Sequence, residues 1–219
     1  MTAGAVTMAG IEAAVRQAGL FVSGHCAALP EDGLGPGVRG VALLSPDEPR
    51  FWEMLSTSPE GQDGGADPVD RWSRRVVGDI AARLGLTPAF PFGGPPWMPF
   101  PRWARRSGRC HESPVKLMVH DAAGLFISFR GALLLPFAPA PDPRPSPCLT
   151  CADQPCLTAC PVGALTGAGY DVPACHAYLD TLPAATGCRA GCLVRRACPV
   201  GQGRRSEAQS VHHMRYFHR

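Results

Sequence analysis

Two cysteine-rich motifs lie in the carboxyl-terminal third of the chain: CLTCADQPCLTACP at residues 148–161 and CRAGCLVRRACP at residues 188–199. One more cysteine, Cys175, lies between them. Together these residues include eight of the ten cysteines in the sequence, and a proline follows the last cysteine of each motif. So many closely spaced thiols indicate either metal binding or a disulfide framework, and the spacing of the cysteines separates these readings.

The first motif has the pattern C-x2-C-x4-C-x3-C-P, two residues longer than the bacterial ferredoxin pattern C-x2-C-x2-C-x3-C-P. A 4Fe–4S cluster takes four cysteine thiolates, so eight cysteines match two clusters. Zinc also takes four cysteines, but zinc knuckles do not call for the C-x3-C-P ending. A disulfide framework is typical of small secreted proteins, which this sequence does not look like. The spacing favours two 4Fe–4S clusters over zinc and disulfides.

The composition is that of a globular protein with one full domain and a second, smaller one. The chain has 219 residues, 45% of them hydrophobic, and a formal net charge of +3. We expect no membrane span, because no run of 18 apolar residues occurs, and no signal peptide at the start. Thiolates that hold iron fit the cytoplasm, where we expect the protein to lie. The sequence shows neither a glycine-rich phosphate loop nor a nucleophile–base set, so we expect neither hydrolysis nor ATP use.

A proline-rich linker at residues 138–147 divides the chain into an α+β domain over 1–137 and a cluster domain with a basic tail over 148–219. Hydrophobic periodicity predicts the regular elements of the first domain. Asp67 is the expected N-cap of its longest helix. We expect helices at 11–18, 49–55 and 68–84, strands at 20–27 and 38–45, a hairpin of strands 115–120 and 125–135, and loops at 56–66 and 86–100.

The cysteine-rich segment resembles the two-cluster module of epoxyqueuosine reductase and the reductive dehalogenases. Besides the first motif, the matching stretches are DVPACHAY at 171–178 and the glycine-preceded second motif at 187–199, whose cysteine spacings are wider than the family's. The resemblance implies a small ferredoxin-like domain with crossed ligation. The implied ligands are Cys148, Cys151, Cys156 and Cys198 for one cluster, and Cys160, Cys175, Cys188 and Cys192 for the other.

The first domain resembles the cobalamin-processing (decyanase/dealkylase) family and the corrinoid domain of epoxyqueuosine reductase. The matching residues are GVALLSPDEPRFWEML at 40–55, DPVDRW at 67–72 and HDAAGLFISFRGALLLP at 120–136. The resemblance implies a flavin-reductase or nitroreductase-like mixed α/β fold. One departure concerns the reductase's acidic segment D-T-x-P-V-L-E, in whose place residues 111–114 read HESP. The queuosine reaction itself is therefore not expected.

Two adjacent clusters predict an electron-transfer protein or iron–sulfur oxidoreductase. On the resemblance, its clusters reduce a corrinoid, or FMN, held by the first domain. The expected cofactor pocket contains Trp97, Phe100, Trp103 and Arg130, and His111 is the expected proton donor or imidazole ligand. The alternative is a ferredoxin-type carrier that docks a partner enzyme and has no second cofactor. In both cases we expect a redox partner protein, and the small net charge gives little reason to expect nucleic acid.

Three arginines lie inside the second motif: Arg189, Arg195 and Arg196. Their positive field favours the reduced, more negative form of a cluster and raises its potential. The alternatives are a docking face for an acidic redox partner and a solvated surface.

Two cysteines lie outside the cysteine-rich segment of residues 148–199, and three histidines lie beyond its end. Cys26 is the expected small core residue, and Cys110, near arginines, is a candidate reactive thiolate. His212, His213 and His218 belong to a basic tail, which we expect to be solvated, with adventitious metal binding as the alternative.

Overall fold

A computed structural model describes residues 6–218, and the chain divides into two compact units. The amino-terminal unit comprises the residues up to 109 together with 128–143. The cysteine unit comprises residues 110–127 and those from 144 onward. Each unit is formed from two stretches of chain, and each is described by itself below.

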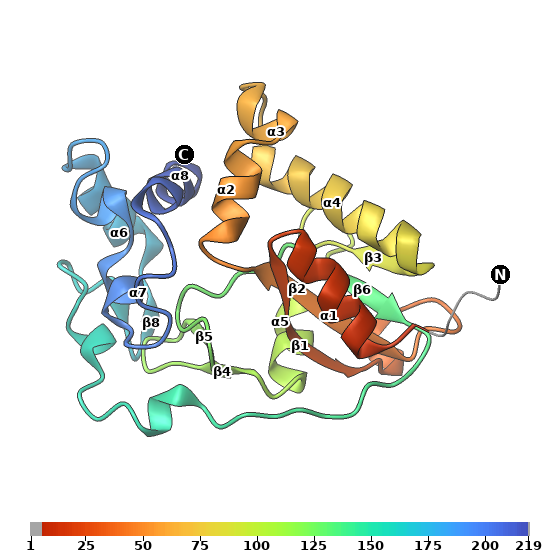
Figure 1. The fold of residues 1–219 in the computed structure, drawn as a ribbon. Coiled ribbons are helices and arrows are strands. Elements are labelled where there is room, and N and C mark those ends of the chain that lie inside the picture. The colour runs from red at the N-terminus through yellow and green to blue at the C-terminus, as the bar shows by residue number, and fades with distance from the viewer. Residues whose placement is uncertain (1–5, 219) are drawn as a thin grey trace. The chain divides into compact units, whose positions relative to one another are not determined.

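An antiparallel sheet of four strands is the centre of the amino-terminal unit, in the order β1-β2-β6-β3 (Figure 1). β2 is a central strand and every one of its residues is buried, which matches its continuous apolar sequence. The register aligns Ala42 with Leu133 across β2 and β6. The strands are β1 (Leu20–Ala27), β2 (Gly40–Pro46), β3 (Thr87–Ala89) and β6 (Gly131–Leu135).

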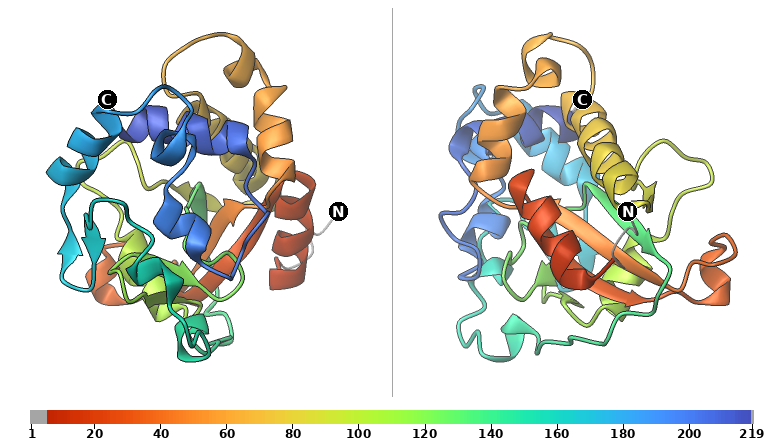
Figure 2. Two further views of the ribbon diagram at one scale, coloured as in Figure 1. Left: turned by 90° about the vertical axis from the view of Figure 1, so that its left-hand side faces the viewer. Right: turned by 45° about the vertical axis from the view of Figure 1, so that its right-hand side comes forward.

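Helices cover both faces of this sheet. α1 and α4 lie side by side across one face, as Figures 1 and 2 show from several directions, and share a core with Leu44 and Leu133. α5 packs against β1 and β2, with Trp103 fully buried. The helices of this unit are α1 (Met8–Gln17), the 3₁₀ turn η1 (Pro30–Asp32), α2 (Arg50–Ser56), α3 (Pro59–Gln62), α4 (Pro68–Leu84) and α5 (Phe100–Arg106).

The cysteine unit consists of short elements joined by turns. Its strands form two small hairpins, β4 (Cys110–Glu112) with β5 (Met118–His120), and β7 (Leu165–Thr166) with β8 (Gly169–Tyr170). Its cores are small and include cysteines among their buried side chains. Its helices are η2 (Pro147–Leu149), η3 (Pro155–Leu157), α6 (Val172–Asp180), η4 (Gly187–Ala190), α7 (Leu193–Ala197) and α8 (Glu207–Phe217).

The chain is thus of mixed α+β class with antiparallel sheets, as expected. The strands predicted at 20–27 and 38–45 and the helices predicted at 11–18, 49–55 and 68–84 are confirmed within a few residues. Asp67 is the residue before α4, but it has a φ of 48° and its side chain makes no capping hydrogen bond. A helix both long and apolar enough to cross a membrane is not found among residues 6–218.

The predicted hairpin of residues 115–120 and 125–135 is wrong. β5 pairs with β4, whereas β6 pairs with β2 and β3 in the other unit's sheet. His120 and Gly124 exchange both backbone hydrogen bonds across a tight turn, and Leu125 is then buried in a core of the cysteine unit. Burial of Leu125 in that core leaves only the end of the predicted second strand to join the sheet.

Three predicted irregular segments contain regular structure. Residues 87–89 form edge strand β3, where Pro88 is tolerated because an edge strand has one side without ladder bonds. Within 56–66, α3 makes one helical turn that starts at the capping hydroxyl of Ser58. The expected solvated tail includes helix α8, on which Gln209, Ser210 and Met214 are buried.

We expected one domain to end at residue 137 and the other to begin at residue 148, and the two observed units have different boundaries. Residues 110–127 group with the cysteine unit, and the proline-rich segment is split at residue 143. Asp142 accepts a hydrogen bond from Arg109 at 3.3 Å, which holds the first part of this segment to the amino-terminal unit.

Candidate metal centre

The seven cysteines of the two motifs and Cys175 line two cavities in the cysteine unit, four around each. The first cysteine site is lined by Cys148, Cys151, Cys156 and Cys198. The second cysteine site is lined by Cys160, Cys175, Cys188 and Cys192. These are the two sets of four that the resemblance implies as cluster ligands; that they bind iron stays a prediction.

Tight turns position the cysteines of the first site. Cys148 and Cys156 each lie in a 3₁₀ turn with a proline just before the cysteine, at Pro147 and Pro155. Proline fixes φ and is favoured at the first position of a helical turn, so each turn begins at a defined residue. The hydroxyl of Ser146 caps the first of these turns by accepting the backbone N–H of Cys148 at 3.4 Å.

Helix α7 connects the two sites. Cys192 is the residue before the helix and belongs to the second site, while Cys198 is the residue after it and belongs to the first. Six residues of helical rise separate these two positions by about 9 Å. The first motif makes a similar connection, because Cys156 lies in the first site and Cys160 in the second. Two short segments therefore hold the sites close together.

Hydrogen bonds reach sulfur atoms of the second site. The hydroxyl of Tyr170 donates to Sγ of Cys175 at 3.3 Å, and the backbone N–H of Ala164 donates to Sγ of Cys160 at 3.2 Å. The Tyr170 ring stacks on Phe217 of α8, with centroids 6.1 Å apart and an interplanar angle of 12°. This stacking orients the hydroxyl that contacts Cys175.

The cavities disfavour bare thiolates. Burial raises the pKa of the Cys156 thiol, and the nearby Cys148, Cys198 and Cys151 raise it further. Burial also raises the pKa values of three further thiols in these cavities, Cys148, Cys175 and Cys188. The neighbouring cysteines of the same site add to the rise in each. Four thiolates in such a cavity require positive charge between them, which iron would supply.

The turn from His120 to Gly124 packs against the first site. A Cβ on Gly124, whose φ is 57°, would lie 2.0 Å from the carbonyl oxygen of Val200 and 3.1 Å from Sγ of Cys198. The fully buried His120 shapes this turn, since its Nδ1 accepts the N–H groups of Ala122 and Ala123 at 3.0 and 3.1 Å. Sequence reasoning placed these residues in a hairpin and missed their contact with a cysteine; the short H-x3-G pattern is the only signal for it.

The donor set fits a 4Fe–4S cluster. Each site provides four thiols, the number a cluster requires, around a cavity whose other lining residues are mainly apolar. Within residues 6–218, no three His, Cys, Asp or Glu side chains are grouped closely enough to hold a single metal ion. The cysteines of a cubane cluster lie farther apart than the ligands of a single ion, because each of the four binds a different iron at a separate corner. Disulfides are absent among the ten cysteines, all of which the structure describes.

Arg195 is the charged residue most closely associated with the second site. It lines that cavity, and its guanidinium donates a hydrogen bond to the carbonyl oxygen of Leu125, which lines the first cavity. Burial lowers the pKa of Arg195, and Cys192 and Tyr170 oppose this shift. Arg196 is exposed, and Arg189 donates to the carbonyl oxygen of Leu182.

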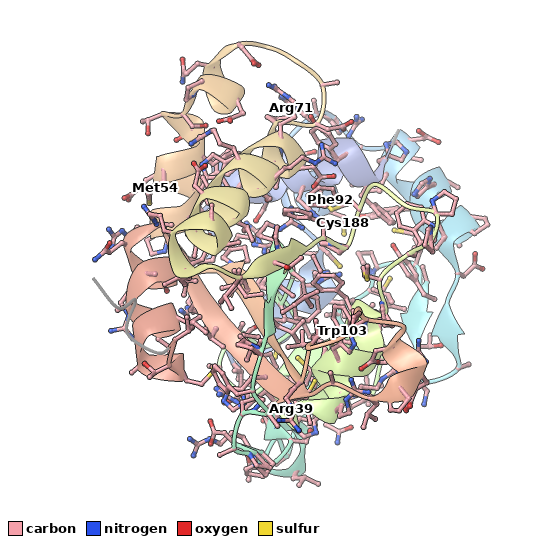
Figure 3. The ribbon with its side chains drawn as sticks, turned by 90° about the vertical axis from the view of Figure 1, so that its right-hand side faces the viewer. Arg39, Met54, Arg71, Phe92, Trp103 and Cys188 are labelled. Carbon is pink, nitrogen blue, oxygen red and sulfur yellow. The ribbon has the colours of Figure 1, made fainter. Side chains whose placement is uncertain are left out.

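The expected cofactor residues of the amino-terminal unit do not share one environment. Trp97 is 65% exposed, whereas Phe100 and Trp103 are core residues whose ring centroids lie 5.1 Å apart on α5 (Figure 3 labels Trp103). Arg130 donates to Asp70 at 3.4 Å, and burial lowers the pKa of Arg130. Packing and an ion pair thus account for three of these four side chains.

His111 lies in the other unit, on β4, where its Nε2 donates to the carbonyl oxygen of Arg144 at 2.9 Å. Cys110, the candidate reactive thiolate, is buried beside it, and Cys26 is a buried residue of β1 as expected. Of the three histidines near the carboxyl end, His212 and His213 lie on α8, and His218 contacts Asp180 at 3.1 Å just after it.

The chain was compared with protein-family models, with curated proteins and with solved structures, and none of the three comparisons found a match.

Proposed function

We propose that this protein transfers electrons through two 4Fe–4S clusters held by the first and second cysteine sites. The observation that carries the proposal is the grouping of eight cysteines into two sets of four, each around its own cavity. The C-x3-C-P ending of the first motif agrees with cluster ligation rather than with a zinc knuckle.

The chain's own residues define what each site does. Four thiols bind, the apolar lining residues such as Val119 and Leu125 limit access of water, and α7 sets the distance between the sites. A bound 4Fe–4S cluster supplies one-electron redox chemistry. Because α7 places Cys192 of the second site and Cys198 of the first only about 9 Å apart, an electron that arrives at one site is within short reach of the other.

The electron acceptor is proposed from the resemblance. We assign the amino-terminal unit to the flavin-reductase or nitroreductase-like class, and its antiparallel sheet with helices on both faces is compatible with that class. The cysteine unit is assigned to the ferredoxin-like two-cluster class. A corrinoid, or FMN, bound by the amino-terminal unit is the proposed acceptor in a cytoplasmic oxidoreductase. The alternative is a carrier without a second cofactor that passes electrons to a partner enzyme.

Iron and sulfide content of the anaerobically reconstituted protein tests the electron-transfer proposal. We expect roughly eight irons and eight sulfides per chain. Cys156→Ser and Cys188→Ser should each lose about half of the iron, because they remove one ligand from different sites. Cys26→Ser, which changes a cysteine of the amino-terminal sheet, is the matched control and should keep all of it. Zinc in place of iron, or iron without sulfide, would contradict the proposal.

Titration of the loaded protein with cob(II)alamin distinguishes the acceptors. A change in the cobalt EPR signal at one equivalent would favour the corrinoid. An unchanged cobalt signal together with flavin binding would favour FMN, and an unchanged signal without flavin binding would favour the carrier.

A further inference from the structure

The two cysteine sites differ in the polarity of their surroundings. The residues that line the first cavity are all uncharged side chains, apart from the cysteines themselves. The second cavity is lined by Arg195 and His213 and by two tyrosines, Tyr170 and Tyr178. This difference bears on function because hydrogen bonds to sulfur and nearby charge set the reduction potential of an iron–sulfur cluster.

Two ligand sulfurs of the second site accept hydrogen bonds of defined geometry. The donors are the Tyr170 hydroxyl to Cys175 and the Ala164 N–H to Cys160. At the first site, the Ser146 hydroxyl accepts the backbone N–H of Cys148. Each donor stabilises negative charge on sulfur, so it favours the reduced cluster over the oxidised one.

Tyr170 is the donor with the most constrained geometry. Its ring is stacked on Phe217 and its hydroxyl contacts Cys175, so stacking and hydrogen bond act on the same side chain. A phenolic O–H carries its proton at neutral pH, so this hydroxyl donates toward the sulfur.

Arg195 adds positive charge at the same site. Arg195 lines the second cavity, and its guanidinium is anchored to the carbonyl oxygen of Leu125. Cys192 and Tyr170 are the groups with which its charge interacts favourably. A cation near a cluster favours the form with more negative charge, which is the reduced form.

We propose that the second cysteine site holds the cluster of higher reduction potential, because Tyr170 donates a hydrogen bond to Cys175 and Arg195 places positive charge beside that site. This inference rests on the proposed function. It predicts that a one-electron-reduced protein carries its electron at the second site. It also gives the relay a direction, from the first site toward the second.

A redox titration of the loaded protein followed by EPR tests the assignment. We expect two waves in the wild type. Tyr170→Phe removes the hydroxyl and keeps the stacked ring, so it should shift only the higher wave, to lower potential. A hydrogen bond contributes about 1 kcal/mol net, or about a fivefold change in the redox equilibrium. That change is about 40 mV at 59 mV per tenfold for one electron. Tyr178→Phe removes a hydroxyl from the same cavity and is the matched control.

Substitutions of Arg195 on α7 test the contribution of its positive charge. Arg195→Met removes the cation and should lower the same wave by at least about tenfold in the redox equilibrium, or about 59 mV. Arg195→Lys keeps the charge and should restore most of the potential. Arg196→Met removes the adjacent, exposed arginine and should leave both waves in place.

The outcomes separate this inference from the proposed function. Two clusters of equal potential, or a lower wave that moves in Tyr170→Phe and Arg195→Met, would overturn the inference and leave the two-cluster proposal standing. Wild-type protein without iron and sulfide would overturn both. If Tyr170→Phe fails to take up iron, Arg195→Lys and Arg195→Met still provide the comparison, because Lys keeps the positive charge that Met lacks at the same position.

Discussion

The two units have cores of different kinds. The amino-terminal unit packs around large apolar side chains on a sheet and its helices, such as Leu44, Trp72 and Leu133, all within 2% of complete burial. In the cysteine unit, the cores are smaller, and their buried side chains include Cys156, Cys188 and Cys198. We expect hydrophobic burial to suffice for folding the first unit, and the second to require the clusters proposed for its cysteines.

Removal of iron should have the largest effect, and it should act on the cysteine unit alone. Because small cores rarely fold alone and metal binding contributes directly to folding, we expect the cysteine unit to lose its tertiary structure on chelation. The amino-terminal unit should keep its own. All four tryptophans lie before residue 110 and all three tyrosines lie after residue 169, so the fluorescence of each type reports on one unit.

Amide hydrogen exchange provides the same test residue by residue. Loss of protection is expected for α6 and α8 and not for β2 and α4. Protection that is lost in both units together, or retained in both, would contradict the difference between the cores.

Leu133→Ala should destabilise the amino-terminal unit and leave the cysteine unit with its iron. Leu133 is fully buried in β6, and such truncations cost about 2–5 kcal/mol. We expect this loss in the urea unfolding of the amino-terminal unit, followed by tryptophan fluorescence, with no change in iron content. Leu29→Ala makes the same change at a residue that is 38% exposed and should cost much less. Iron loss in Leu133→Ala would show that the two units do not fold separately.

Gly124→Ala examines a contact within the cysteine unit. The added Cβ would meet the carbonyl oxygen of Val200 and the sulfur of Cys198, so we expect the first site to lose about half of the total iron while the second keeps its share. Gly163 also has a left-handed φ, 63°, but a Cβ there meets nothing within 4 Å. Gly163→Ala should therefore cost only backbone strain, about 1 kcal/mol, and retain all of the iron. Equal iron content in the two variants would rule out the proposed contact.

The smallest effect is expected from an ion pair of the amino-terminal unit. Arg75 forms two hydrogen bonds with Glu60, at 2.6 and 2.8 Å, and lowers the pKa of Glu60 from 4.5 to about 2. The ion pair stabilises the fold above pH 4.5, and this stabilisation is lost as the pH falls toward 2. Because Arg75 is 45% exposed, we expect only about 1 kcal/mol.

Urea unfolding at pH 5.5 and pH 3, read by tryptophan fluorescence, measures this effect. Wild type should lose about 1 kcal/mol more than Glu60→Gln between the two pH values. Glu12→Gln, at an exposed glutamate of α1, should behave as wild type. An identical pH dependence in Glu60→Gln and wild type would mean that the ion pair contributes nothing.

Sequence periodicity predicted the amino-terminal unit well where one segment makes one element. α4 and β2 are examples, since their apolar spacing alone indicates both the element and its buried face. It failed at residues 115–135, whose alternation is typical of a hairpin. The strands there belong to different sheets, because the turn from His120 to Gly124 closes on itself and Leu125 is buried in the cysteine unit. Which strand each of these segments pairs with depends on tertiary contacts, so local periodicity does not reveal it.

The cysteine sites show a similar limit. The number and spacing of cysteines suggest eight ligands, but spacing alone does not say which four share a cavity. That grouping depends on the route of α7 between Cys192 and Cys198. The hydroxyl of Tyr170 and the guanidinium of Arg195 could not be placed at a sulfur from the sequence, because neither position follows a local pattern.

The central claim is that two clusters are held by cysteines in crossed sets, and iron content of two double variants tests it most directly. Cys148→Ala/Cys198→Ala removes two ligands of the first site only, so roughly four irons should remain. Cys148→Ala/Cys160→Ala removes one ligand from each site, so little iron should remain. The reverse result, with about four irons in the second variant and little in the first, would show ligation in sequence order and contradict the account.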